Sequence, residues 1–366
     1  MRLVFFVHSL VSDWNHGNAH FLRGVVGELV DRGHDVHVYE PEDAWSRDNL
    51  VRSHGERPLR EFARAFPDLA SEVYGRGLDV AAAVDGADAV LVHEWNAPWL
   101  VRAVGRSGAL ALFHDTHHRA VTAPAEMRRY DLSGYAGVLA FGARIADVYR
   151  DRGWHDRAWV WHEAADTRIF RPLRRKKVGD VVWIGNWGDG ERTQEVRRFL
   201  LWPARRVGLT GTVHGVRYPE SGRRAVNRAG LDYRGWLANY LVPEAFARHR
   251  VTLHVPRRPY VRALPGIPTI RPFEALACGI PLVSAPWDGA EALFTPGDDF
   301  LVAKNGREME RLLREVLHDE ALARSLARRG RRTILERHTC AHRVDELLAI
   351  LRGLGVRGLK PVEAAA

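Results

Sequence analysis

The segment Pro265–Ser284, which reads PGIPTIRPFEALACGIPLVS, carries the densest pattern of residues suited to binding a ligand. A helix that begins near Ile270 would present free backbone N–H groups and the positive end of its dipole, and both suit a diphosphate. Arg271 adds a guanidinium fork that fits phosphate oxygens. Glu274 adds a carboxylate whose two oxygens can accept hydrogen bonds from vicinal ribose hydroxyls. Together, these groups around Arg271 and Glu274 have the chemistry to bind a phosphorylated nucleoside.

Helical spacing supports this arrangement of the segment. Pro272 fits the first turn of a helix that ends before Gly279. The predicted buried stripe consists of Phe273, Leu276 and Ala277. The other face carries Arg271, Glu274 and Cys278. A simpler explanation of Glu274 is that it complements the helix dipole, worth about 0.3–1 kcal/mol, and on these residues alone that explanation is the stronger one.

A second polar group follows an apolar strand. It consists of His114, Asp115, Thr116, His117 and His118. An imidazole at a strand end can donate a hydrogen bond or act as a general acid or base. The same residue types can also bind a metal, and a polar loop packed against its neighbours is the third explanation.

The elements that would position these residues begin with a strand, a loop and a helix. Residues 2–8 form a continuous apolar run, typical of a buried parallel strand. Apolar residues from Phe21 to Val30 predict a helix with Asn18 as its N-cap and Gly33 at its end. With a second strand over 35–39, this order places the loop 9–17 at the carboxyl edge of a parallel sheet, where such sheets bind ligands.

The alternation continues through the chain and predicts two domains. Further strands are predicted over 87–93, 109–114, 136–141, 158–162, 180–184, 210–215, 233–236, 251–255, 281–285 and 300–302, with helices over 193–207, 307–317 and 320–354. The basic stretch 173–179 is typical of a linker. We expect an α/β protein with two doubly wound, Rossmann-like domains facing a central cleft. The first domain spans 1–170 and the second 180–335, with a linker over 171–179 between them. A C-terminal helix over 336–354 packs back on the first domain, and a flexible tail spans 355–366.

Residues 265–284 resemble the donor-site helix of retaining glycosyltransferase family 4, which includes sucrose and mannosyl transferases. They resemble more closely the spore-maturation branch, with its pattern Arg-x-Phe-Glu-Ala-x-Ala-x-Gly. The wider family has two glutamates eight positions apart; Glu274 matches the second, which holds the ribose, whereas Gly266 stands where the first would be. The resemblance implies the GT-B fold, with the nucleotide-sugar donor bound by the second domain and the acceptor by the first.

Other segments match the same family. Residues 162–172 resemble its domain-crossing segment, and residues 288–291 resemble a segment that often closes with a glutamate. The family places a glycine and basic residues around the donor phosphates at the end of the first strand of the second domain. Gly185 matches that glycine, and Arg192 is our candidate basic group, although an exposed arginine at a helix start explains it equally well. The resulting donor-site prediction comprises Glu274, Arg271, Gly185, Asn186, Arg192, Gly266, Thr269 and Ile270.

The resemblance also assigns roles in the first domain. The family commonly has a histidine at a strand end near the anomeric carbon, so His114 and Asp115 become the candidate catalytic residues. No metal is expected, because GT-B enzymes hold phosphate with amides and arginines. The loop after the first strand lacks GxGxxG and is not a dinucleotide fingerprint. The predicted acceptor and phosphate loop comprises His16, Gly17, Asn18 and Glu94.

Composition narrows the alternatives. Net charge is +9, which suits phosphorylated ligands or acidic lipids, yet the basic residues lack any nucleic-acid-binding motif. The two cysteines form no zinc or disulfide pattern. With no signal peptide or membrane-spanning stretch evident, we expect a cytoplasmic protein, peripheral to the membrane at most, that binds no nucleic acid.

The expected activity is transfer of a sugar from a nucleoside-diphosphate sugar to a hydroxyl of a glycan, lipid or small molecule. The resemblance implies retention at the anomeric carbon, and no cofactor is expected beyond the co-substrate. A catalytically silent sugar-binding module and a nucleotide-sugar epimerase are the alternatives. The missing glutamate at position 266 favours the silent module.

Overall fold

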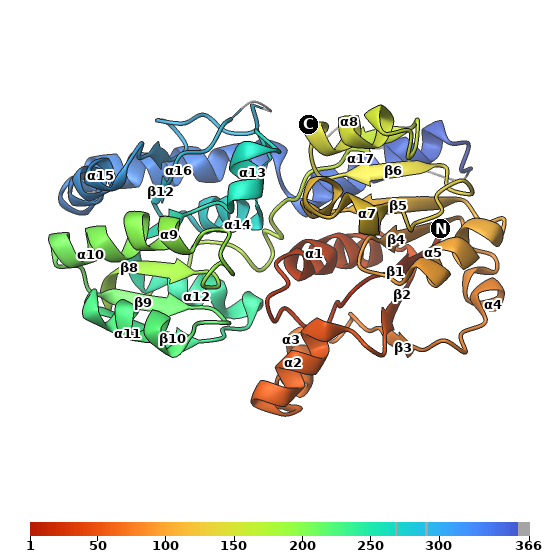
Figure 1. Cartoon of the computed structure of the whole chain (residues 1–366), viewed down its shortest axis with the longest axis horizontal. Coiled ribbons are helices and arrows are strands. Elements are labelled where there is room, and N and C mark those ends of the chain that lie inside the picture. Colours follow the sequence, from red (N-terminus) through yellow and green to blue (C-terminus); the bar gives the residue numbers. More distant parts are fainter. Residues whose placement is uncertain (268, 290–291, 358–366) are drawn as a thin grey trace. The chain divides into compact units, whose positions relative to one another are not determined.

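The computed structural model describes residues 1–267, 269–289 and 292–357 and divides the chain into two compact units (Figure 1). Unit 1 contains Met1–Glu163 and the chain from Cys340 onward, and unit 2 contains Ala164–Thr339. The predicted linker 171–179 falls inside unit 2. There the Val178 N–H donates to the Arg248 carbonyl, and Lys177 Nζ lies 3.0 Å from the Ala247 carbonyl oxygen.

Unit 1 is built on a seven-stranded parallel sheet with the order β3-β2-β1-β4-β5-β6-β7. Its strands are β1 (Arg2–Phe6), β2 (Asp35–Pro41), β3 (Glu72–Tyr74), β4 (Ala89–His93), β5 (Ala111–Asp115), β6 (Gly137–Ala140) and β7 (Ala158–Val160). Strands β4, β5 and β6 are buried along their whole length, as expected for parallel strands covered on both faces. Their apolar runs were therefore visible in the sequence.

The helices of unit 1 include one from the far end of the chain. They are α1 (Asn18–Asp31), α2 (Trp45–His54), α3 (Arg57–Ala65), α4 (Val80–Val84), α5 (Pro98–Arg106), α6 (Arg119–Thr122), α7 (Pro124–Met127), α8 (Ala143–Asp151) and α17 (Cys340–Gly353). Helix α17, blue in Figure 1, packs against α1. Its buried side chains include Val344, Leu347 and Leu351, and the Arg343 carbonyl accepts a hydrogen bond from Trp161 Nε1 at 2.8 Å.

Unit 2 has a six-stranded parallel sheet with the order β10-β9-β8-β11-β12-β13. Its strands are β8 (Gly179–Ile184), β9 (Gly211–His214), β10 (Leu231–Gly235), β11 (His249–His254), β12 (Leu282–Ser284) and β13 (Leu301–Val302). Its α-helices are α9 (Thr193–Val196), α10 (Trp202–Val207), α11 (Glu220–Arg228), α12 (Val242–Ala247), α13 (Arg258–Arg262), α14 (Ile270–Cys278), α15 (Gly306–His318) and α16 (Glu320–Arg337). A 3₁₀ turn over Asn239–Leu241 precedes α12. Two doubly wound parallel sheets confirm the predicted fold class.

Several local predictions need correction. Asn18 is the first residue of α1 rather than its N-cap, and its amide donates to Glu163 Oε1 at 3.3 Å. The helix predicted over 193–207 contains one π-helical turn at Arg197–Leu201, between α9 and α10. The helix predicted over 320–354 breaks into α16 and α17 at His338–Thr339. Strand β3 has only three residues and was not predicted, because a run that short carries no readable period.

No helix in the described part of the chain is long and apolar enough to cross a bilayer.

Candidate functional site

Helix α14 begins beside the carboxyl ends of β11 and β12 in unit 2. Its N-cap residue, Thr269, makes no side-chain hydrogen bond to the first turn, and its hydroxyl lies 3.3 Å from His254 Nε2. His254 Nδ1 in turn lies 3.0 Å from the Ser284 hydroxyl. The N–H groups of Ile270 and Arg271 therefore have no partner within the helix. A helix start of this kind attracts anions.

The histidine at this edge carries no charge near neutral pH. Burial lowers the pKa of His254 to about 3, and the guanidiniums of Arg192 and Arg271 add to the effect. The two side chains that contribute positive charge are therefore arginines.

Arg192 turns its guanidinium into unit 2 instead of into solvent. Nη1 donates to the Val255 carbonyl at 3.1 Å, Nη2 donates to Asn186 Oδ1 at 2.8 Å, and the group lies 5.3 Å from the centre of the Trp183 ring. Burial, followed by the charge of Arg257, lowers the pKa of Arg192 to about 9, so it stays protonated at neutral pH. In the described chain no carboxylate forms an ion pair with it, and Nε has no partner. A partly buried cation in this state favours an anionic ligand.

Two glycines make room for Arg192. A Cβ at Gly185 would lie 2.9 Å from Arg192 Nη2 and 2.9 Å from the Trp183 ring. At Gly188, where φ is +99°, a Cβ would lie 2.3 Å from Arg192 Cγ. The predicted glycine at position 185 therefore creates space for the predicted arginine.

Replacing Gly185 with alanine should destabilise unit 2 by about 1–3 kcal/mol, because the added methyl group forces Arg192 or Trp183 to move in a packed region. Urea denaturation measures the change. Gly77→Ala is the matched control, since a Cβ there would have no atom within 4 Å. A Gly185→Ala protein as stable as the wild type would contradict the inward position of Arg192.

Glu274 is fully buried and lies at the centre of a three-residue group. Its Oε1 accepts a hydrogen bond from Asn239 Nδ2 at 2.7 Å, and its Oε2 is paired with Arg271. The predicted pair Arg271 and Glu274 therefore contact each other directly. The predicted polar face of α14 is also buried, since Glu274 and Cys278 are as enclosed as the apolar stripe.

The other predicted donor residues lie around these groups. Gly266 has φ +87°, a left-handed conformation for which glycine is favoured. Thr269 and Ile270 form the start of α14. Pro268, in the same loop, lies outside the described residues, as do Ala290 and Glu291 at the end of the predicted segment 288–291.

In unit 1, four buried histidines follow one another along the carboxyl edge of the sheet. Neighbouring ring centres lie 5.1 Å apart for His8 and His16, 5.9 Å for His16 and His93, and 5.5 Å for His93 and His114. Burial lowers the pKa of His8 and of His114 to about 3, and it lowers the pKa of His16 and of His93 well below the usual value. All four rings are therefore neutral at physiological pH.

Two buried carboxyl groups lie next to this row, at the ends of β4 and β5. Burial raises the pKa of Glu94, and the charge of Asp115 raises it further; burial likewise raises the pKa of Asp115. Asp115 accepts hydrogen bonds from the His117 N–H at 3.1 Å and from the Tyr149 hydroxyl at 2.8 Å. Arg119 Nη1 lies 3.4 Å from Glu94 Oε2. Two adjacent carboxyls of this kind favour a state in which they share one proton.

The structure brings four predicted residues of the first domain to one edge, namely His16, Glu94, His114 and Asp115. Gly17 is exposed with φ −65°, so its backbone does not demand glycine. Asn18 turns toward Glu163. Within the described ranges, no three His, Cys, Asp or Glu side chains are grouped to hold a metal ion.

The comparisons with known proteins agree on the architecture. Residues 192–349 match a family model described as "Glycosyl transferase-like". No curated protein matches the chain. Phage T4 BGT in complex with its UDP-glucose substrate has a TM-score of 0.61 at 13% identity, covering 97% of this chain and 100% of that chain. Sucrose-phosphate synthase from Thermosynechococcus elongatus has a TM-score of 0.66 at 14% identity, covering 97% of this chain and 99% of that chain. Anabaena HepE in complex with UDP-glucose has a TM-score of 0.66 at 13% identity, covering 96% of this chain and 100% of that chain.

The chain has the GT-B fold. Arg192 and α14 of this GT-B protein both fall within the segment that matches the family model.

Sequence reasoning missed several residues of the two sites, among them Arg119, Tyr149 and Asn239. Arg119 follows the polar run 114–118 directly, and its charge next to that run was a usable signal. Tyr149 and Asn239 lie 34 and 35 positions from their partners Asp115 and Glu274, and no local pattern links them.

Proposed function

We propose that this GT-B protein is a glycosyltransferase that moves a sugar from a nucleoside-diphosphate sugar to a hydroxyl group. The observation that carries the proposal is the state of Arg192. It is a protonated, partly buried guanidinium with no carboxylate partner among the described residues, and its buried Nε makes no hydrogen bond. A diphosphate would supply the missing negative charge.

The comparisons support the proposal in two ways. The matching family model is a glycosyl transferase model and spans unit 2 from Arg192 onward. Structures of T4 BGT and HepE with the same fold are complexes with UDP-glucose. The pattern around Glu274 supports assignment to the family 4 or spore-maturation branch, with retention at the anomeric carbon.

In the proposed donor site, Arg192 and the first N–H groups of α14 hold the diphosphate. As the bond to the sugar breaks, negative charge grows on the leaving diphosphate, and these fixed donors stabilise it more than they stabilise the ground state. Neutral His254 donates or accepts one hydrogen bond without adding charge. In this mechanism arginines and backbone amides supply the positive potential, and no metal or organic cofactor is required.

Glu274 is proposed to bind the ribose. Because Arg271 and Asn239 already contact its two oxygens, the carboxylate is held in one orientation before a nucleotide arrives. Unit 1 would supply the acceptor side, with His114 and Asp115 as the acid-base candidates.

The test is a thermal-shift screen against UDP, GDP, ADP, CMP and dTDP, alone and as sugar conjugates, followed by an assay for nucleoside-diphosphate release. We expect one nucleotide to raise the melting temperature selectively. Glu274→Gln should weaken the binding of that nucleotide by at least 1 kcal/mol and so reduce the thermal shift, because an amide is a weaker hydrogen-bond acceptor than a carboxylate. Glu310→Gln, at a surface ion pair with Arg206, is the matched control.

The outcomes separate the alternatives. Selective binding without nucleotide release would favour a catalytically silent module, which is also consistent with the absence of a glutamate at position 266. Conversion of the donor sugar without any acceptor would indicate an epimerase. No response to any nucleotide would contradict the donor site.

A further inference from the structure

Three tryptophans and one histidine form a continuous aromatic surface at the carboxyl edge of unit 1. Trp14 and Trp45 have ring centres 6.5 Å apart, Trp45 and Trp95 5.9 Å, and Trp95 and His117 5.3 Å. All four side chains are half-buried, so part of each remains accessible. We call these four residues the tryptophan surface. They come from the loops after β1, β4 and β5 and from the first residue of α2.

Behind this surface lie two buried nitrogen atoms with no hydrogen-bond partner in the described structure, His16 Nε2 and His93 Nδ1. The His16 ring packs 6.3 Å from the Trp45 ring and 5.9 Å from the His93 ring. His93 Nε2 is 2.8 Å from the Thr116 hydroxyl, and in the tautomer in which it donates, Nδ1 offers a lone pair. A buried polar atom without a partner is costly, so a group that pairs with it would bind favourably.

Two arginines next to the tryptophan surface are already paired. Arg119 stacks 4.5 Å over the Trp95 ring, and its terminal nitrogens lie 3.4 Å from Glu94 and 3.1 Å from Glu126. Arg23 is paired with Asp13, which precedes Trp14, at 2.8 Å. The histidines of the row are neutral. The surface is thus locally close to neutral, although the chain as a whole carries +9.

We propose that the tryptophan surface binds the acceptor as an uncharged sugar ring. The sugar's C–H face packs on an indole, and its hydroxyls bond to His16 Nε2 and His93 Nδ1. The inference rests on the proposed function for its role as acceptor, but the binding itself does not. A ligand site made of aromatic walls with a few directed polar groups is typical of small-molecule recognition.

The same features argue against other ligand classes. A lipid chain would cover the indoles but leave both imidazole nitrogens unpaired. A nucleic acid or a phosphorylated acceptor needs free cations, whereas Arg119 and Arg23 are both neutralised. A neutral ring that presents several hydroxyls can pack on the indoles and also form hydrogen bonds with the two imidazole nitrogens.

The experiment is saturation-transfer NMR on the full chain with methyl glycosides of glucose, galactose, mannose and N-acetylglucosamine, and with glucose 6-phosphate. We expect at least one methyl glycoside to bind and to bind more tightly than the phosphorylated sugar. Trp45→Ala should weaken that binding about tenfold, because it removes the indole face on which the sugar packs. His16→Phe, which keeps a ring but removes the nitrogens, should also weaken it.

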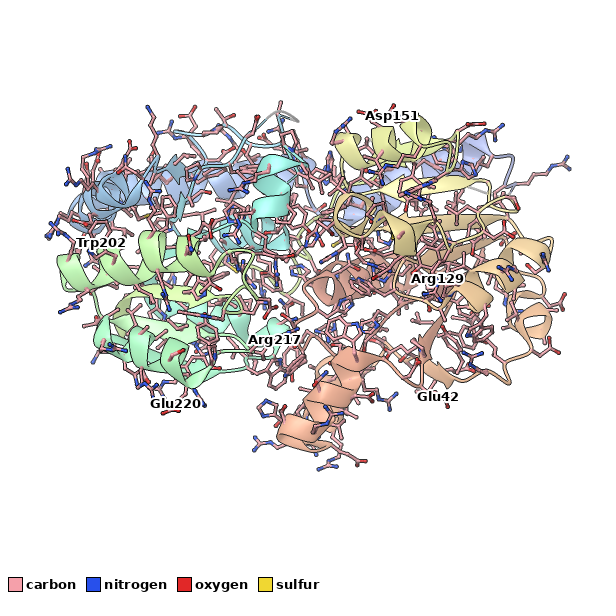
Figure 2. All side chains as sticks on the ribbon, in the orientation of Figure 1. Glu42, Arg129, Asp151, Trp202, Arg217 and Glu220 are labelled. Atoms are coloured by element: carbon pink, nitrogen blue, oxygen red, sulfur yellow. The ribbon has the colours of Figure 1, made fainter. Side chains whose placement is uncertain are left out.

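The control is Trp202→Ala. Trp202 is 46% exposed on α10, which belongs to unit 2 rather than to unit 1, and is labelled in Figure 2. It should leave sugar binding unchanged. No saturation transfer to any methyl glycoside, tighter binding of glucose 6-phosphate, or equal losses in Trp45→Ala and Trp202→Ala would each overturn the inference. Sugar binding that persists in a protein that binds no nucleotide would uphold the inference while contradicting the proposed function.

Discussion

Replacing Arg192 with methionine should lower nucleoside-diphosphate affinity about 100-fold while leaving unit 2 folded. A hydrogen bond from a charged donor to phosphate contributes roughly 1.5–3 kcal/mol, which corresponds to about 10- to 150-fold in affinity. Methionine has a similar length and fills the space beside Trp183 without a charge. The substitution also removes the cost of burying a charged guanidinium that has no carboxylate partner. In the stability of unit 2, this gain offsets the loss of the hydrogen bonds to Asn186 and Val255.

Calorimetric titration with the nucleotide selected by the thermal-shift screen measures this effect, and urea denaturation measures the stability. Arg206→Met is the control, because Arg206 is exposed and paired with Glu310 at 3.0 Å. Arg192→Lys should recover part of the affinity, since lysine keeps the charge but loses the fork. Unchanged affinity in Arg192→Met would show that Arg192 has a purely structural role.

Acidification from pH 7 to pH 5 should remove several kcal/mol of the stability that the buried histidines give to unit 1, and proton uptake by Glu94 and Asp115, whose pKa values are raised in the folded state, should offset part of that loss. His8 and His114 have folded-state pKa values of about 3, whereas the unfolded value is 6.5, so the unfolded chain binds protons first. The stability from keeping these rings neutral is complete above pH 6.5 and is lost as the pH falls from there toward 3. At pH 5 the loss is roughly 2 kcal/mol for each of these two histidines. His16 and His93 shift in the same direction and add to it.

Denaturation curves at pH 7, 6 and 5 test this expectation. His114→Phe should reduce the pH dependence by roughly 2 kcal/mol, because phenylalanine does not titrate. His54→Phe is the control, since His54 is exposed on α2. A pH dependence as large in His114→Phe as in the wild type would mean that the His114 ring is not enclosed as the structure shows.

Much of the fold was readable in the sequence because it depends on local patterns. The apolar runs of β4, β5 and β8 have the composition of strands buried on both faces, and they fall within a few residues of the predicted ranges. Helix α14 ends at Gly279, whose φ of +66° needs glycine. The order of strands and helices also identified the carboxyl edges, because parallel strands must all end there.

The chemistry of both sites was decided by packing between distant positions. Whether Arg192 points into solvent or into the protein depends on Trp183, Gly185 and Val255. From the sequence, an exposed arginine and a phosphate-binding arginine were equally good explanations. Asn239 meets Glu274 only because a 3₁₀ turn lies beside α14. The neutrality of the histidine row arises from burial among several loops, which no single segment encodes.

The sequence by itself thus determined the two doubly wound sheets, their carboxyl edges and the helical segment that carries Arg271 and Glu274. Hydrophobic periodicity and turn residues are sufficient to predict these features, because both depend only on residues that are close together in the chain. Only the tertiary structure decided which charges are paired and which imidazoles are neutral. Hydrogen bonds and pKa values depend on what surrounds a group in space, and chain folding brings those neighbours from far along the sequence.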